Sequence, residues 1–167
     1  DNNDYIFFKR YLITYIFSLV IISAFIQVLF IWQRSLIKDD FKEHLFAYIG
    51  GILREIKCHP IIVGGYQDHV HILYEMSTTT SISEQMRIVK CNSSKWVNES
   101  NFSKKRFEWQ NGYGAFAISR AHRERVINYI NNQESHHKKE SFRSEYMEYL
   151  KHHEMEVPIE FLFEFVD

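Results

Sequence analysis

The sequence contains little cysteine, and this shortage limits the kinds of protein it can encode. Cys58 and Cys91 are the only two cysteines, and they are far apart and in no CxxC pattern. A disulfide framework and a cysteine cage for zinc are therefore excluded. Two packed thiols in a reducing compartment are the simplest interpretation, so we expect a cytoplasmic protein.

The chain also lacks the length for two ordinary domains, and it contains no internal repeat or low-complexity tract. Its 167 residues are 46% hydrophobic and 16% aromatic, which is enough to fill one core without disulfides or a structural metal. We expect one domain over residues 23–153. An atypical apolar extension, residues 1–22, precedes it, and an acidic tail, residues 154–167, follows it.

An excess of positive charge is missing as well, because the formal net charge is -1. This balance hides an asymmetry, since residues 154–167 contain five acidic residues and no Lys or Arg. The remainder has 20 basic and 16 acidic residues, a balance of about +4. Lys and Arg concentrate in residues 87–106 and 120–143, which suits a phosphate backbone but equally suits solvated helix faces.

Charge is absent altogether from residues 11–32, which follow Lys9 and Arg10. By length and hydropathy this segment qualifies as a membrane span. Its Ile, Val, Phe and Tyr residues equally suit a buried strand. Both interpretations stay open at this point.

Beyond residue 34 the pattern is that of an α+β domain. Apolar residues at helical spacing predict a helix over 39–57, and two short apolar runs, 59–65 and 69–76, predict a hairpin. Hydroxyl residues at 78–81 would cap a helix that continues to about residue 98. Residues 101–114 are polar and basic and predict a loop without a core role.

Further elements are predicted after this loop: a strand over 115–119, one helix over 120–138, and a last helix over 142–153. If the apolar run before Arg34 supplies the first strand, the order is strand, helix, strand, strand, helix, strand. This order predicts a ferredoxin-like antiparallel sheet with helices on one face.

A His-x-His pair lies in the second strand of the predicted hairpin. His69 and His71 are two residues apart, so both project from the same face of the strand and can share one cation. In a chain with 9 histidines, such a pair is a weak signal by itself.

Tyr129 and Gln133 strengthen this signal, because they stand one helical turn apart and share a helix face. Two neutral imidazoles and one amide oxygen form an open coordination shell that suits Mg²⁺ or Mn²⁺. Taken alone, Tyr129 and Gln133 are each better explained as ordinary residues of an amphipathic helix. Only their combination with the histidine pair indicates a site.

Four segments together resemble the HUH single-tyrosine transposases, the small enzymes of insertion sequences that move as single-stranded DNA. The similar segments occur in the family's order within roughly residues 24–150. They are residues 67–73 (QDHVHIL), 90–96 (KCNSSKW), 107–116 (FEWQNGYGAF) and 126–137 (VINYINNQESHH). Family members have Pro where this chain has Gln67, which alters the turn but removes no ligand.

The resemblance implies that His69, His71 and Gln133 bind Mg²⁺ or Mn²⁺ and that Tyr129, on a helix in the C-terminal half, is the nucleophile. Residues 23–153 would then be the catalytic domain, acting on single-stranded DNA with hairpins. The resemblance also implies a homodimer with composite active sites. Candidate DNA contacts are the cations Lys90, Lys95, Lys104, Lys105 and Arg106 and the stacking rings Trp109 and Tyr113, with Trp96 and Phe116 equally suited to the core.

Two alternatives share parts of this pattern. A domesticated or degenerate relative that binds or nicks hairpin DNA would have every residue named above. A membrane-anchored binding protein, from another class, would require residues 11–32 to insert, with the histidine pair incidental.

Overall fold

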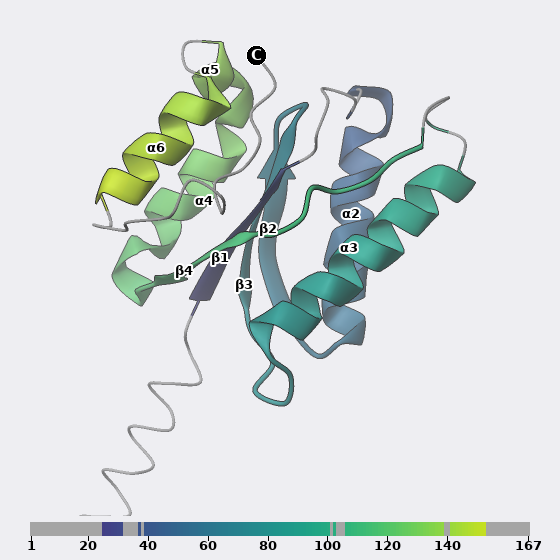
Figure 1. Cartoon of the computed structure of the whole chain (residues 1–167). Coiled ribbons are helices and arrows are strands. Elements are labelled where there is room, and N and C mark those ends of the chain that lie inside the picture. Colours follow the sequence, from purple (N-terminus) through teal and green to yellow (C-terminus); the bar gives the residue numbers. More distant parts are fainter. Residues whose placement is uncertain are drawn as a thin grey trace, which may run out of the picture.

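The computed structural model describes residues 25–31, 37, 39–100, 102, 106–138 and 141–152 (Figure 1). The elements are β1 (Phe25–Ile31), α2 (Asp39–Glu55), β2 (His59–Gly65), β3 (His69–Glu75), α3 (Ile82–Glu99), β4 (Gly114–Ile118), the 3-10 turn η1 (Arg120–His122), α4 (Arg123–Asn131), α5 (Gln133–His137) and α6 (Phe142–His152). The predicted extension 1–22 and tail 154–167 lie outside the described residues, as do Lys104 and Lys105.

Four strands form one antiparallel sheet in the order β2-β3-β1-β4. With the chain order β-α-β-β-α-β, this is the ferredoxin-like arrangement, so the predicted fold class is confirmed. β1 pairs with a strand on each side, and the apolar segment 11–32 therefore contributes residues 25–31 to the middle of the sheet. Within the described part of the chain, no helix is long and apolar enough to cross a membrane.

Both faces of the sheet are covered. Val70, Ile72 and Tyr74 of β3 belong to the main core, which they share with residues of α2 and α3. Leu73 points the other way and forms a second cluster with Ile130 of α4. The helices predicted for one face are thus α2 and α3, while α4 and α5 lie on the opposite side of the sheet (Figure 1).

The predicted start of α3 is confirmed, and the predicted single helix over 120–138 is wrong. Ser81 caps α3, since its hydroxyl accepts a hydrogen bond from the Glu84 amide at 3.2 Å. The later helix is divided into η1, α4 and α5, with a break at Asn132. The Asn132 amide still bonds the carbonyls of Asn128 and Tyr129, so the break does not leave that donor unsatisfied.

The prediction that the loop 101–114 has no core role is also wrong. Phe107 is completely buried and belongs to the main core. The side chain of Asn98 on α3 holds the Phe107 backbone at both ends, accepting from its amide at 2.7 Å and donating to its carbonyl at 3.0 Å. This clamp fixes the segment 106–113 against α3.

Candidate active site and surface groove

The two histidines of the His-x-His pair lie side by side on the sheet face that carries α4 and α5. The exposed fraction is 0% for His69 and 2% for His71, and their ring centroids are 4.9 Å apart. The prediction that both side chains project from one strand face is confirmed. Because buried polar side chains need partners, the neighbours of this pair decide what it can do.

Tyr129 and Gln133 reach the same two histidines from α4 and α5 of the same chain. The Tyr129 ring lies edge-on to His71, with centroids 5.4 Å apart. Oε1 of Gln133 is 2.8 Å from Nε2 of His69, in a buried contact. The four residues predicted from spacing and resemblance therefore meet in one cluster.

Two glycines allow close packing next to the cluster: one lets α4 approach β2, and the other lets the β2–β3 turn approach the backbone of β3. Gly64 pairs with His71 in the sheet, and a Cβ at Gly64 would lie 2.7 Å from Cγ2 of Ile130 and 3.3 Å from its backbone oxygen. A Cβ at Gly65 would lie only 2.2 Å from the carbonyl oxygen of His69. α4 thus packs directly on glycine backbone, which sets how near Tyr129 lies to His71.

The His69 side chain is held at both ring nitrogens. Nδ1 lies 2.7 Å from Oδ1 of Asp68, and a carboxylate there accepts the Nδ1–H. With the proton on Nδ1, the form that a metal ligand takes, the lone pair of the ring is on Nε2 and faces the oxygen of Gln133. Two acceptors in contact require a proton or a cation between them, and a carboxylate behind a histidine is the usual support of a metal ligand.

The donor set therefore fits a divalent cation. The 2.8 Å between Nε2 and Oε1 matches two adjacent ligands of one ion with bonds of about 2.1 Å. No group of three or more His, Cys, Asp or Glu suited to a metal occurs within the described ranges. The candidate set instead consists of two imidazoles and one amide oxygen, which leaves positions for water and substrate.

Burial and neighbouring charge tune the acid–base groups of the cluster. Burial, followed by repulsion from His69, holds the pKa of His71 well below its ordinary value, while the Gln133 side chain opposes the shift. Burial raises the pKa of Asp68, but its hydrogen bond to His69 and its electrostatic interactions with His69 and His137 outweigh that, so the pKa is lowered. A neutral His71 beside an ionised Asp68 is the protonation pattern that a metal site requires.

Three residues of the cluster were missed by the sequence reasoning: Asp68, Tyr66 and His137. The ring of His137 stacks on Tyr66 with centroids 5.0 Å apart and lies 4.6 Å from the ring of His69. Two of them had a signal in the sequence, since Asp68 directly precedes His69, and His137 follows Gln133 by one helical turn.

A groove of about 630 Å³ lies on the other side of the sheet, between α3 and the segment 106–113. Nζ of Lys90 on α3 donates to the carbonyl of Gln110 at 2.8 Å and also to the carbonyl of Gly112. Nε1 of Trp109 donates to Oγ of Ser93 at 2.9 Å. These contacts tie the two walls of the groove together.

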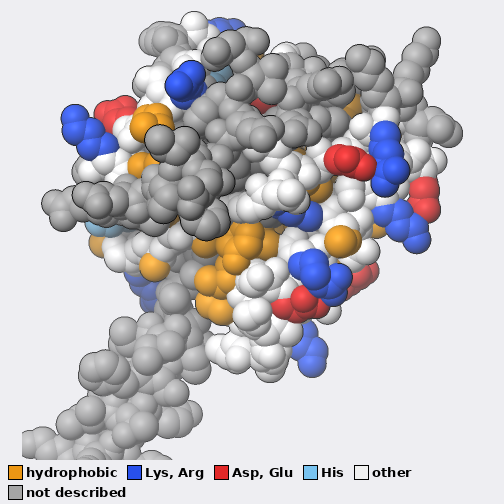
Figure 2. Space-filling model, in the orientation of Figure 1, with side chains coloured by type: hydrophobic (Ala, Val, Ile, Leu, Met, Phe, Trp, Pro, Cys, Tyr) orange, Lys and Arg blue, Asp and Glu red, His pale blue; other side chains and the backbone are white. Residues whose placement is uncertain are grey.

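The predicted DNA-contacting residues that the structure describes all line this groove: Lys90, Lys95, Arg106, Trp109 and Tyr113. Their charge is partly balanced, because Lys95 lies 3.8 Å from Glu99 and Arg106 lies 2.8 Å from Glu108. Figure 2 shows blue and red side chains next to one another on this side of the molecule. The groove is therefore only mildly basic.

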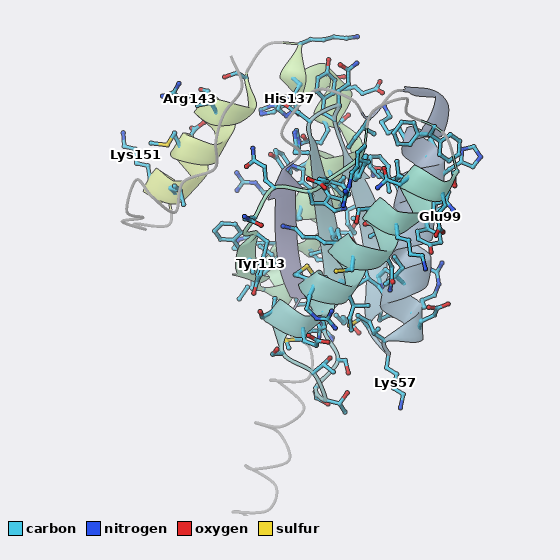
Figure 3. All side chains as sticks on the ribbon, turned by 45° about the vertical axis from the view of Figure 1, so that its right-hand side comes forward. Lys57, Glu99, Tyr113, His137, Arg143 and Lys151 are labelled. Atoms are coloured by element: carbon cyan, nitrogen blue, oxygen red, sulfur yellow. The ribbon has the colours of Figure 1, made fainter. Side chains whose placement is uncertain are left out.

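The groove and the histidine cluster are separate regions of the molecule. In Figure 3, His137 lies at the α5 end of the fold, and Tyr113 lies well away from it, next to the start of β4. The other two stacking candidates are less available as platforms. Trp96 stacks on Tyr48 with centroids 4.7 Å apart, and Phe116 is half-buried in β4.

Comparisons with known proteins agree with this arrangement. Residues 23–133 match the family model for IS200-like transposases. A candidate transposase from Deinococcus radiodurans R1 has a similar crystal structure, with a TM-score of 0.54 at 16% identity over 65% of this chain and 89% of that one. A REP-associated tyrosine transposase bound to a REP hairpin is similar, with a TM-score of 0.54 at 15% identity over 68% of each chain. No curated protein sequence matches.

The two structural similarities show the fold, and the family match covers more than half of the chain. The chain belongs to the IS200-like transposases, a family of DNA-cleaving enzymes.

Proposed function

We propose that this chain cleaves and rejoins single-stranded DNA at the hairpin-bearing ends of a mobile element, through a covalent bond between Tyr129 and a 5′ phosphate. The observation that supports this most directly is the buried cluster, in which Tyr129 packs against His71 next to the contact between His69 and Gln133. The similar transposase that is bound to a REP hairpin supports the choice of hairpin DNA as substrate.

In the cleavage step, the phenolic oxygen of Tyr129 forms a bond to phosphorus while the bond from phosphorus to the 3′ oxygen breaks. The phenol loses one proton and the departing 3′ oxygen gains one, so the step is balanced. The products are a free 3′-hydroxyl and a 5′-phosphotyrosine. Because the phosphodiester energy is kept in this intermediate, another 3′-hydroxyl can reverse the step and join new strands without ATP.

His69, His71 and Gln133 would hold Mg²⁺ or Mn²⁺. When bound, the ion would supply Lewis-acid stabilisation at the reacting phosphate, which a phenol with a pKa of about 10 needs at neutral pH. Asp68 keeps Nε2 of His69 available as a lone pair. The burial of His69, His71 and Gln133 keeps bulk water away from these donor atoms.

DNA would be held outside the cluster, with phosphates near Lys90, Lys95, Lys104, Lys105 and Arg106 and bases on Trp109 and Tyr113. The homodimer with composite active sites stays a prediction. The side chains of the cluster come from a single chain here, and an exchange of α4 and α5 between two copies would build the same cluster twice.

The test mixes the full chain with a hairpin-bearing single-stranded oligonucleotide and Mn²⁺ and looks for a covalent adduct on a denaturing gel. We expect an adduct that disappears with a chelator and with Tyr129→Phe. Tyr48→Phe is the matched control, because Tyr48 is exposed on α2 and its ring can keep its stacking on Trp96.

An adduct that persists in Tyr129→Phe would show that the nucleophile is misassigned. A second oligonucleotide with a free 3′-hydroxyl tests rejoining. Cleavage without any joined product would favour the domesticated nicking protein over the transposase.

A further inference from the structure

α5 is too short to be stable without contacts to the rest of the fold. It spans the five residues Gln133–His137, fewer than an isolated helix needs to be stable in water. Its position therefore depends on contacts with the rest of the fold. One contact is the bond between Gln133 and His69, and another is an ion pair between Glu134 and Lys42 of α2, a lysine that is almost completely buried.

His137 makes a third contact, and it reaches the histidine pair directly. Its ring contacts two others: the ring of Tyr66, nearly parallel at 16°, and the ring of His69, tilted at 55°. Tyr66 belongs to the turn between β2 and β3, and its amide donates to the carbonyl of His69 at 3.1 Å. The Tyr66–His137–His69 stack therefore links α5, the turn and the start of β3.

The contacts of His69 act on the rotation of its ring about the Cβ–Cγ bond. Asp68 holds Nδ1 and Gln133 faces Nε2, and both contacts resist this rotation. A hydrogen bond tolerates a moderate change of angle, so small rotations remain possible. The His137 ring limits them, because they would push His69 into its neighbour.

We propose that His137 is a positioning residue that fixes the plane of the His69 ring and thereby aims Nε2 at a divalent cation. The inference rests on the proposed function, since it takes His69 as a metal ligand. It assigns to His137 a role through ring shape, not as a ligand. The ion pair between Lys42 and Glu134 offers a separate tether that keeps α5 docked when the His137 ring is removed.

The test is calorimetric titration of the full chain with Mn²⁺ alone, without DNA. We expect His137→Ala to bind Mn²⁺ about tenfold more weakly, in the range typical of supports behind a metal ligand. His137→Phe keeps a flat ring and should stay within about threefold of the unsubstituted chain. His59→Ala, which removes an exposed histidine at the far end of β2, is the matched control and should bind normally.

Unchanged Mn²⁺ affinity in His137→Ala would overturn the inference and leave the proposed function intact. Binding by His137→Phe as weak as that of His137→Ala would overturn it too, because a ring nitrogen would then be required. Failure of the unsubstituted chain to bind Mn²⁺ would instead overturn the metal role of the whole cluster. If His137→Ala does not fold, Tyr66→Ala removes the outer ring of the stack, and unchanged affinity there would contradict the inference.

Discussion

The two faces of β3 differ in kind although they come from alternate residues of one strand. Val70, Ile72 and Tyr74 face α2 and α3 and fill an apolar core. His69 and His71 face α4 and α5 and are equally buried, but their neighbours are polar and aromatic side chains. The first face supplies burial of apolar surface, while the second combines the apolar contact between Leu73 and Ile130 with two histidines whose polar atoms gain nothing from apolar burial.

The difference shows how a small domain separates stability from chemistry. A strand with a period of two assigns neighbouring residues to opposite faces, so a substitution on one face leaves the other largely unchanged. The groove beside α3 lies on the same side of the sheet as the apolar core. One segment contributes to both, since Phe107 fills the core while Trp109 and Tyr113 line the groove.

Among substitutions that compare the two faces of β3, His71→Ala should have the largest effect. Removing one ligand of the proposed ion should lower adduct formation by about a thousandfold, because metal stabilisation of the transition state is worth several kcal/mol. The adduct is measured on a denaturing gel, and circular dichroism checks the fold. An active His71→Ala variant would show that the two faces of β3 do not divide chemistry from stability.

Ile72→Ala tests the opposite face at the next residue. Ile72 is completely buried, so its truncation should lower the free energy of unfolding by about 2–5 kcal/mol, measured by urea denaturation. Adduct yield per folded molecule should stay near that of the unsubstituted chain. A large loss of adduct at full folding would mean that the two faces are coupled.

Gly64→Ala tests the contact that sets the position of α4. The added Cβ would meet Ile130 at 2.7 Å, and α4 must shift because the backbone oxygen of Ile130 is also close. A displacement of Tyr129 by about 1 Å should lower the cleavage rate by about a hundredfold. Gly51→Ala is the control, since a Cβ there would meet nothing within 4 Å, and single-turnover cleavage compares the two variants.

The smallest effect concerns Lys90 in the groove. Burial lowers its pKa to about 8. Between that pH and its ordinary pKa of about 10.5, the folded protein has released a proton that the unfolded chain keeps, so the free energy of unfolding should rise with pH across this window. Loss of the charge should weaken DNA binding a few-fold between pH 7 and 9.

Fluorescence anisotropy of a labelled hairpin measures this change. Lys90→Met should remove the pH dependence, and an equally steep profile in Lys90→Met would show that another group is responsible. Binding that does not change between pH 7 and 9 in the unsubstituted chain would separate Lys90 from DNA contact.

Patterns within one element were predictable from the sequence. The two short apolar runs in residues 59–76 predicted the hairpin, and the two-residue spacing predicted that His69 and His71 share a face, because strand geometry is local. The hydroxyl residues before α3 predicted its start for the same reason.

Contacts between elements were not predictable in this way. The break at Asn132, the burial of Phe107 and the ring stack at His137 each depend on partners distant in the chain. The glycines before Tyr66 indicated a turn, but they lie at the end of β2 and make room for α4 and for the backbone of His69. Composition does not distinguish a glycine that is needed in a turn from a glycine whose missing side chain permits close packing.

The sequence by itself determined the residue types of the candidate site and their family, because coordination chemistry and strand and helix periods are properties of short segments. The tertiary structure decided that Tyr129 and Gln133 reach the histidines within one chain, that Asp68 and His137 contact His69, and that the described DNA-contact candidates line a groove on the other face. These are distances between segments brought together by burial, which no local pattern encodes.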